Sequence, residues 1–235
     1  MMVFILFVVC CDLSLGRVDK ASLSQQTLME LLIQNITNKE HVYGSGDATD
    51  IAKWKKVRMN EMHEVITIDW SCSQLKGAFD LRWLPISVIH FRISINYCTG
   101  SFDLTGLPDA LENMWLGDNR YTGEISLTCL PTSLRSLDAS QNAFVGSITL
   151  TQLPDMMVSL FLHVNRFSGS IDITKLPRKL KELDLGENPL HGETDFHHLP
   201  DSLMYMNLEK TNISGTIIRK NCDLYMEGSK VKIVE

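Results

Sequence analysis

The chain lacks the surplus of lysine and arginine with which proteins bind the phosphates of nucleic acids. It carries 22 lysine and arginine residues against 28 aspartate and glutamate residues, for a formal net charge of −6. Because binding to a phosphate backbone needs a positive field, we expect no nucleic acid among its partners.

Long apolar runs are lacking beyond the N-terminus. Residues Met1 to Cys11 are apolar throughout, and Ser14 and Gly16 are small residues at a spacing suited to cleavage before Arg17. The run is about half of the ~20 residues that a membrane span needs, so we interpret residues 1–16 as a secretory signal peptide. It has no basic segment in front, which leaves a gene model truncated at its start as the alternative. We expect a secreted or cell-surface protein with no membrane span in this chain.

Motifs for catalysis and for metal binding are also absent. Cys72, Cys98, Cys129 and Cys222 lie far apart and form no CxxC pair, and no serine or cysteine nucleophile stands beside a histidine in a known motif. His197 and His198 follow Asp195, but solvated histidines at a turn are far commoner than metal ligands. We therefore predict no enzyme, no metal site and no cofactor.

The chain does contain an internal repeat. The dipeptide Leu-Pro recurs every 23 residues, beginning at Leu84, Leu107, Leu130, Leu153, Leu176 and Leu199. If this leucine is position 1, positions 5, 8, 10, 15, 19 and 21 are apolar, position 13 is asparagine in five copies and position 17 is glycine. A first copy, Glu61 to Trp83, lacks Leu-Pro but keeps the phase. Such a period indicates a solenoid of stacked coils.

Each column of the repeat has a physical reading. Positions 8 and 10 alternate with polar neighbours, which predicts a short strand with one buried face, and stacked coils turn these strands into a parallel sheet. The asparagine side chain can bond backbone groups of its own and neighbouring coils, and the glycine permits a backbone conformation or a close approach that a side chain forbids. The alternation Gly-x-Ile-x-Leu predicts a second short strand on the convex side, and proline at position 2 disfavours a helix there.

The pattern Leu-x-x-Leu-x-Leu-x-x-Asn-x-Phe-x-Gly-x-Ile resembles the leucine-rich-repeat family. The Gly-x-Ile ending resembles the extracellular type of plant receptors, and the Leu-Pro-x-x-Leu opening resembles repeat proteins of flagellate protists. The resemblance covers residues 61–221 and implies an α/β solenoid, mostly β, of about seven coils with a parallel concave sheet. It implies a binding role for the chain, or that the chain is a truncated ectodomain of a membrane receptor.

The segments flanking the repeats are expected to cap the solenoid. In residues 17–60, Leu23 to Ile36 has the apolar spacing of an amphipathic helix with Ser24 as its N-cap, and the polar stretch 38–50 indicates a loop. Residues 54–59 resemble the Trp-x-Gly-Val-x-Cys cap of plant-type members. Lys56 and Met59 replace its glycine and cysteine, so the cap disulfide is absent. Residues 222–235 are expected to end the solenoid with a short strand.

We place the candidate binding surface on the concave face, defined as the outward positions 6, 7, 9, 11 and 12 of each coil. Acidic side chains outnumber basic ones at these positions, which favours a neutral or basic partner. Trp115 and Phe161 are two coils apart, about 10 Å, and large aromatic side chains on a rigid sheet are typical binding anchors. The candidate contacts are His90, Arg92, Trp115, Asp138, Phe161, His163, Asp184 and Tyr205.

The predicted function is recognition of a protein, peptide or glycan on this face. The alternative is a structural repeat protein that associates with copies of itself. Asn35 and Asn212 begin Asn-x-Ser/Thr sequences and are candidate glycosylation sites if the chain is secreted.

Overall fold

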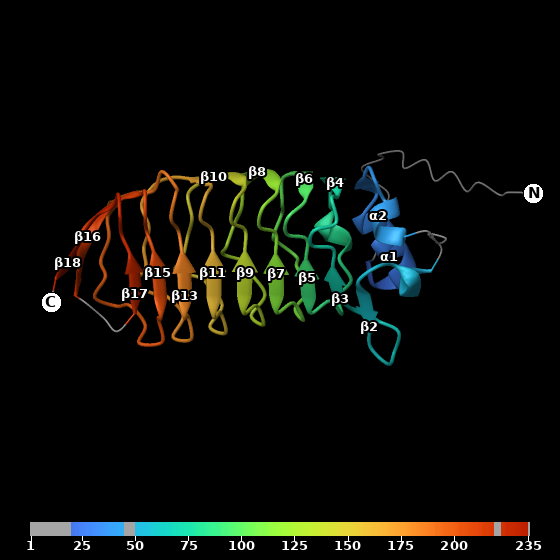
Figure 1. Cartoon of the computed structure of the whole chain (residues 1–235). Coiled ribbons are helices and arrows are strands. Elements are labelled where there is room, and N and C mark those ends of the chain that lie inside the picture. The colour runs from blue at the N-terminus through green and yellow to red at the C-terminus, as the bar shows by residue number, and fades with distance from the viewer. Residues whose placement is uncertain (1–19, 45–49, 219–221, 235) are drawn as a thin grey trace, which may run out of the picture.

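The computed structural model describes residues 20–44, 50–218 and 222–234. It is a mostly-β solenoid whose coils stack along one axis, with helices α1 and α2 at one end and strands β16 and β18 at the other (Figure 1). The predicted stack of about seven coils with parallel sheets and little helix is confirmed. The predicted signal peptide, residues 1–16, lies outside the described residues, as do residues 219–221 at the end of the seventh coil.

The longest sheet has nine strands and carries the positions that define the concave face. Each coil contributes one strand, and neighbouring strands pair in parallel with partners 23 residues apart, as between Leu137 and Leu160. The first strand, from the N-terminal cap, pairs antiparallel with the second. In spatial order the strands are β2 (Val57–Met59), β3 (Val65–Asp69), β5 (His90–Arg92), β7 (Asn113–Trp115), β9 (Ser136–Asp138), β11 (Ser159–Phe161), β13 (Glu182–Asp184), β15 (Tyr205–Asn207) and β17 (Asp223–Tyr225).

The predicted second strands form two sheets on the other side of the solenoid. One has six strands, β1 (Asn35–Ile36), β4 (Lys76–Ala78), β6 (Tyr97–Gly100), β8 (Arg120–Glu124), β10 (Ala143–Gly146) and β12 (Arg166–Phe167). The other has three strands, β14 (His191–Glu193), β16 (Asn212–Ile218) and β18 (Lys230–Val234). The break falls at Pro189. At the same position of an earlier coil, the Tyr97 N–H donates to the Leu75 carbonyl, and proline has no N–H to give.

The core lies between these sheets and consists of the apolar columns of the repeat. Position 15 forms a spine through the stack, in which the rings of Tyr121, Phe144 and Phe167 follow one another at centroid distances of 6.2 Å. Cys98 occupies the same column and is fully buried, as predicted. Each aromatic ring removed from water contributes roughly 1.5–3 kcal/mol to stability.

The asparagines of position 13 form the predicted ladder. In five consecutive coils, the amide nitrogen donates to the position-10 carbonyl of the preceding coil at 2.9–3.2 Å. The amide oxygen accepts from the position-15 N–H of that preceding coil, as Asn165 does from Phe144 at 3.0 Å. One side chain thus pairs a donor and an acceptor that would otherwise be buried without partners.

The backbone adopts the left-handed region, with positive φ, at positions 17 and 12 of the repeat. All seven glycines at position 17 have positive φ, and a Cβ on Gly77 would lie 2.1 Å from the Asn35 carbonyl oxygen. This confirms the interpretation of the glycine column. Position 12 also has positive φ in all seven coils, between 51° and 58°, although none of its residues is glycine. The residues are Cys72, Ile95, Asp118, Gln141, Val164, Glu187 and Lys210.

The predicted N-terminal helix is present and begins at its predicted N-cap residue. Helix α1 (Gln25–Leu32) begins after Ser24, whose hydroxyl accepts from the Thr27 N–H, and its apolar face packs on the first coil. The expected loop 38–50 instead contains a short helix, α2 (Glu40–Tyr43). Single-turn 3₁₀ helices span Lys20–Ser22, Ile51–Lys53 and Leu81–Trp83.

Residues 222–234 extend both faces of the solenoid. Strand β17 adds to the nine-stranded sheet and β18 to the three-stranded one. Gly228, at φ 73°, and Ser229, whose hydroxyl donates to the Met226 carbonyl at 2.6 Å, reproduce the turn of positions 12 and 13. The segment is therefore a shortened further coil.

Candidate binding face

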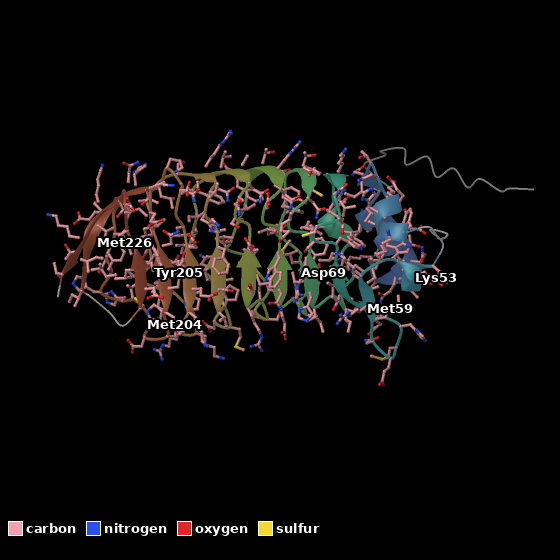
Figure 2. All side chains as sticks on the ribbon, in the orientation of Figure 1. Lys53, Met59, Asp69, Met204, Tyr205 and Met226 are labelled. Atoms are coloured by element: carbon pink, nitrogen blue, oxygen red, sulfur yellow. The ribbon has the colours of Figure 1, made fainter. Side chains whose placement is uncertain are left out.

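The predicted contact residues lie on one continuous sheet. Position 9 forms a column in which neighbouring residues are register partners: Asp69, Arg92, Trp115, Asp138, Phe161, Asp184, Asn207 and Tyr225. Figure 2 shows Asp69 toward one end of this sheet and Tyr205 toward the other. Position 7, which holds His90 and Tyr205, forms a parallel column beside it.

Trp115 is the most exposed aromatic residue among the predicted contacts and its ring is held on both sides. The guanidinium carbon of Arg92 lies 4.2 Å from the ring centroid, and Arg92 also approaches Asp69 at 3.9 Å. The indole N–H donates to the Ser136 hydroxyl at 3.2 Å. Trp115 as a whole is 36% exposed. A cation over the ring and a hydrogen bond at its edge fix an apolar surface that faces water.

The Asp138 carboxylate is fixed and accessible. Its Oδ1 atom accepts from the Ser140 N–H at 2.9 Å and from the Ser140 hydroxyl at 2.6 Å. The carboxylate lies over Gly117, where a Cβ would be 2.8 Å from Oδ2. Within the described part of the chain, Oδ2 has neither a hydrogen-bond donor nor a basic side chain as partner.

Asp184 is the most buried of the candidate contacts, and its contact with a partner stays a prediction. Its side chain is 8% exposed and accepts from the Tyr205 hydroxyl at 3.1 Å and the Gly186 N–H at 3.1 Å. His163 Nδ1 approaches it at 3.4 Å. Burial and the negative Asp184 raise the pKa of Tyr205 to about 12. Asp184 therefore organises His163 and Tyr205 and leaves those two side chains at the surface.

His90 is oriented by its neighbour in the next coil. The Asn113 amide lies 2.9 Å from His90 Nδ1, which accepts if the ring proton is on Nε2. Burial, followed by the positive charge of Arg92, lowers the pKa of His90, which favours the neutral ring. It offers a partner a neutral, polar ring.

Two apolar residues of position 12 are strained and exposed on this face. Ile95 has φ 58° with 55% of its surface exposed, and Val164 has φ 54° with 38% exposed. β-Branched residues rarely adopt the left-handed region, and burial does not compensate them here. Strain of this kind concentrates at functional sites. Sequence reasoning missed it because the column contains seven residue types and no glycine.

The remaining sequence candidates lie away from this face. His197 Nδ1 is 2.6 Å from Asp195, with both side chains exposed. Within residues 20–44, 50–218 and 222–234, no three histidine, cysteine, aspartate or glutamate side chains are grouped as a metal site. The same residues contain no helix long and apolar enough to span a bilayer. Asn35 and Asn212 are exposed, and their glycosylation stays a prediction.

Comparison with known proteins gives a likeness in structure and none in sequence. No protein-family model matches the chain, and no curated protein matches it. The leucine-rich-repeat ectodomain of the plant membrane receptor kinase GASSHO1/SCHENGEN3 from Arabidopsis thaliana, solved with CASPARIAN STRIP INTEGRITY FACTOR 2, has a TM-score of 0.65 at 20% identity. That alignment covers 90% of this chain and 29% of the ectodomain.

Two further structures show the same architecture. A plant ice-binding protein has a TM-score of 0.65 at 15% identity, covering 88% of this chain and 71% of its own. PEPR1, solved with AtPEP1, has a TM-score of 0.58 at 16% identity, covering 82% of this chain and 32% of its own. The chain spans about a third of PEPR1 and less of the GASSHO1/SCHENGEN3 ectodomain. The 23-residue repeat, the asparagine ladder and these neighbours together show that the chain has the leucine-rich-repeat fold.

Proposed function

We propose that the chain is a recognition module that binds a peptide or protein partner on its concave face, outside the cell. The observation that carries the proposal is the ordered row Arg92, Trp115, Asp138 and Phe161, in which an exposed ring is fixed in advance by its neighbours. Fixed aromatic anchors bind well because little conformational entropy is lost when a partner arrives. The strained, exposed Ile95 and Val164 support the same face.

Two of the structural neighbours fit this proposal. The GASSHO1/SCHENGEN3 ectodomain and PEPR1 were solved in complexes with CASPARIAN STRIP INTEGRITY FACTOR 2 and AtPEP1. We extend to this chain the general role, recognition by the solenoid, and neither ligand. We propose no catalytic step for it.

The proposal is tested with a library of random displayed peptides selected on the immobilised wild-type protein. The double variant Trp115→Ala/Phe161→Ala should lose binding of the selected peptides while its circular dichroism and melting temperature stay near those of the wild type. The matched control is Tyr97→Ala, since Tyr97 is a 46% exposed aromatic on the other side of the solenoid. Unchanged binding to the double variant, or enrichment on a glycan array with no peptide selected, refutes a peptide-binding concave face.

A second candidate, ice binding, is favoured by the convex sheets. Position 16 carries a short hydroxyl side chain in four of the seven coils, on strands about 4.8 Å apart, and Lys76, Val145 and His191 interrupt the row. Those of Thr99, Thr122 and Ser214 donate to the glycine carbonyl of the preceding coil at 3.2–3.4 Å. One structural neighbour is a plant ice-binding protein. Thermal hysteresis that disappears in Thr122→Lys would support this role, and its absence in the wild type would exclude it.

A further inference from the structure

The chain itself shows how the concave face holds a cation. Arg92 lies between an acidic and an aromatic neighbour of the same column, 3.9 Å from Asp69 and 4.2 Å from the Trp115 ring centroid. Its side chain is 28% exposed. A carboxylate and a ring face both attract a guanidinium, and partial burial strengthens the two attractions.

The next residues of the column combine the same two kinds of cation-attracting group, with an acid between two aromatic rings. Asp138 stands between Trp115 and Phe161 as a register partner of both. The Trp115 and Phe161 backbones are two strand spacings, about 9.6 Å, apart, so a cation above Asp138 would lie about 5 Å along the stack from each ring-bearing strand. That distance is within the ~6 Å over which a ring face attracts a cation.

The Asp138 carboxylate is prepared for such a ligand. Ser140 holds Oδ1 with two hydrogen bonds, which fixes the plane of the carboxylate and leaves Oδ2 to an incoming donor. Gly117 in the preceding coil provides the space, because a Cβ there would meet both carboxylate oxygens within 2.9 Å. A preorganised acceptor gains more from a charged donor than a mobile one does.

Position 9 supplies no free basic side chain to neutralise Asp138, because Arg92 would have to leave Asp69 to reach it. Arg92 is the one lysine or arginine at position 9 in the seven coils, and it is committed to Asp69 and Trp115. Of the other basic residues of the face, Arg135 pairs with Glu112 at 3.4 Å and Lys210 with Glu187 at 3.0 Å, and Lys181 lies two coils from Asp138 at position 6. A surplus of negative charge thus remains at Asp138.

We infer that Asp138, flanked by Trp115 and Phe161, recognises a lysine or arginine side chain of the peptide partner. This inference rests on the proposed function and specifies which kind of peptide residue the concave face recognises. Asp138 accepts a charged hydrogen bond through Oδ2, and the two rings cover the side chain that donates it.

The test uses the peptides selected on the wild-type protein. Each lysine or arginine of a selected peptide is replaced by glutamine, one at a time, and dissociation constants are measured for the wild type, Asp138→Asn and Asp118→Asn. Asp138→Asn keeps the acceptor for Ser140, and Asp118→Asn removes an acid of the same face that has no aromatic neighbour in its column.

We expect one basic residue per peptide whose replacement weakens binding about tenfold. Asp138→Asn should weaken binding of the parent peptide by the same factor. Replacing the basic residue should then not weaken binding to Asp138→Asn any further, because the two changes remove the same contact. Asp118→Asn should bind as the wild type does. Full binding to Asp138→Asn, or losses that simply add, overturns the inference. If Asp138→Asn binds fully but Trp115→Ala/Phe161→Ala abolishes binding, the proposed function stands and the inference about Asp138 fails. If neither variant changes peptide binding, the proposed function itself is refuted.

Discussion

Replacing Val164 with asparagine should stabilise the protein, although it removes an apolar side chain. Val164 adopts φ 54°, and the left-handed region costs an L-residue roughly 1–2 kcal/mol. Asparagine tolerates this region, whereas a β-branched residue does not. Because 38% of Val164 is exposed, the substitution loses less burial than it would at a core valine, and the free energy of unfolding should rise by up to about 1 kcal/mol.

The same column supplies the opposite experiment. Asp118 has φ 54° and a residue type that accepts it, so Asp118→Val should lower the free energy of unfolding by about 1 kcal/mol. Urea denaturation followed by circular dichroism measures both variants, and a change of 1 kcal/mol corresponds to about 2–4 °C in melting temperature for a chain of this size. If both variants shift stability in the same direction, or Val164→Asn does not stabilise, strain at position 12 is the wrong explanation.

Two further predictions concern the core. Asn165→Ala should lower the free energy of unfolding by about 3 kcal/mol in urea titrations, because the buried Phe144 N–H loses its acceptor; a loss below about 1 kcal/mol would contradict the ladder. At pH 8.5, iodoacetamide should modify Cys129 and spare Cys98, whose pKa burial raises to about 11; equal labelling by mass spectrometry would contradict its burial. Since the unfolded thiol ionises near pH 8.5, Cys98 should also make stability fall as the pH rises through 9–11.

The scaffold was predictable from the sequence because its physical requirements repeat. Every coil needs buried apolar side chains at the same positions and the same glycine, and five of the seven coils carry the same asparagine. The 23-residue period therefore predicts the strands, the asparagine ladder and the burial of Cys98. The left-handed turn at position 12 repeats as well, but many residue types tolerate it at some cost. Lys56 in the N-terminal cap also adopts left-handed backbone without being glycine. It replaces the glycine of the similar plant-type motif and has φ 57°.

The candidate site was harder to predict because its residues do not repeat. The sequence placed the eight candidate contacts on one face, yet it could not separate Asp138 from Asp184, which occupy the same position two coils apart. Their difference arises from contacts between coils. Such contacts depend on how side chains lean along the stack, which a column of residue types does not reveal.

A diagonal contact between neighbouring coils explains why Asp138 is accessible to a partner and Asp184 is buried. Position 11 of each coil lies beside position 9 of the next. Gly117 at position 11 leaves Asp138 without cover, whereas His163 at position 11 lies 3.4 Å from Asp184 and helps to bury it. Gly186 likewise makes room for Asn207, because a Cβ at Gly186 would lie 2.8 Å from the Asn207 amide nitrogen. The residue at position 11 thus decides whether the next polar side chain of the central column faces a partner or the scaffold, which makes Gly117 the residue that opens the face at Asp138.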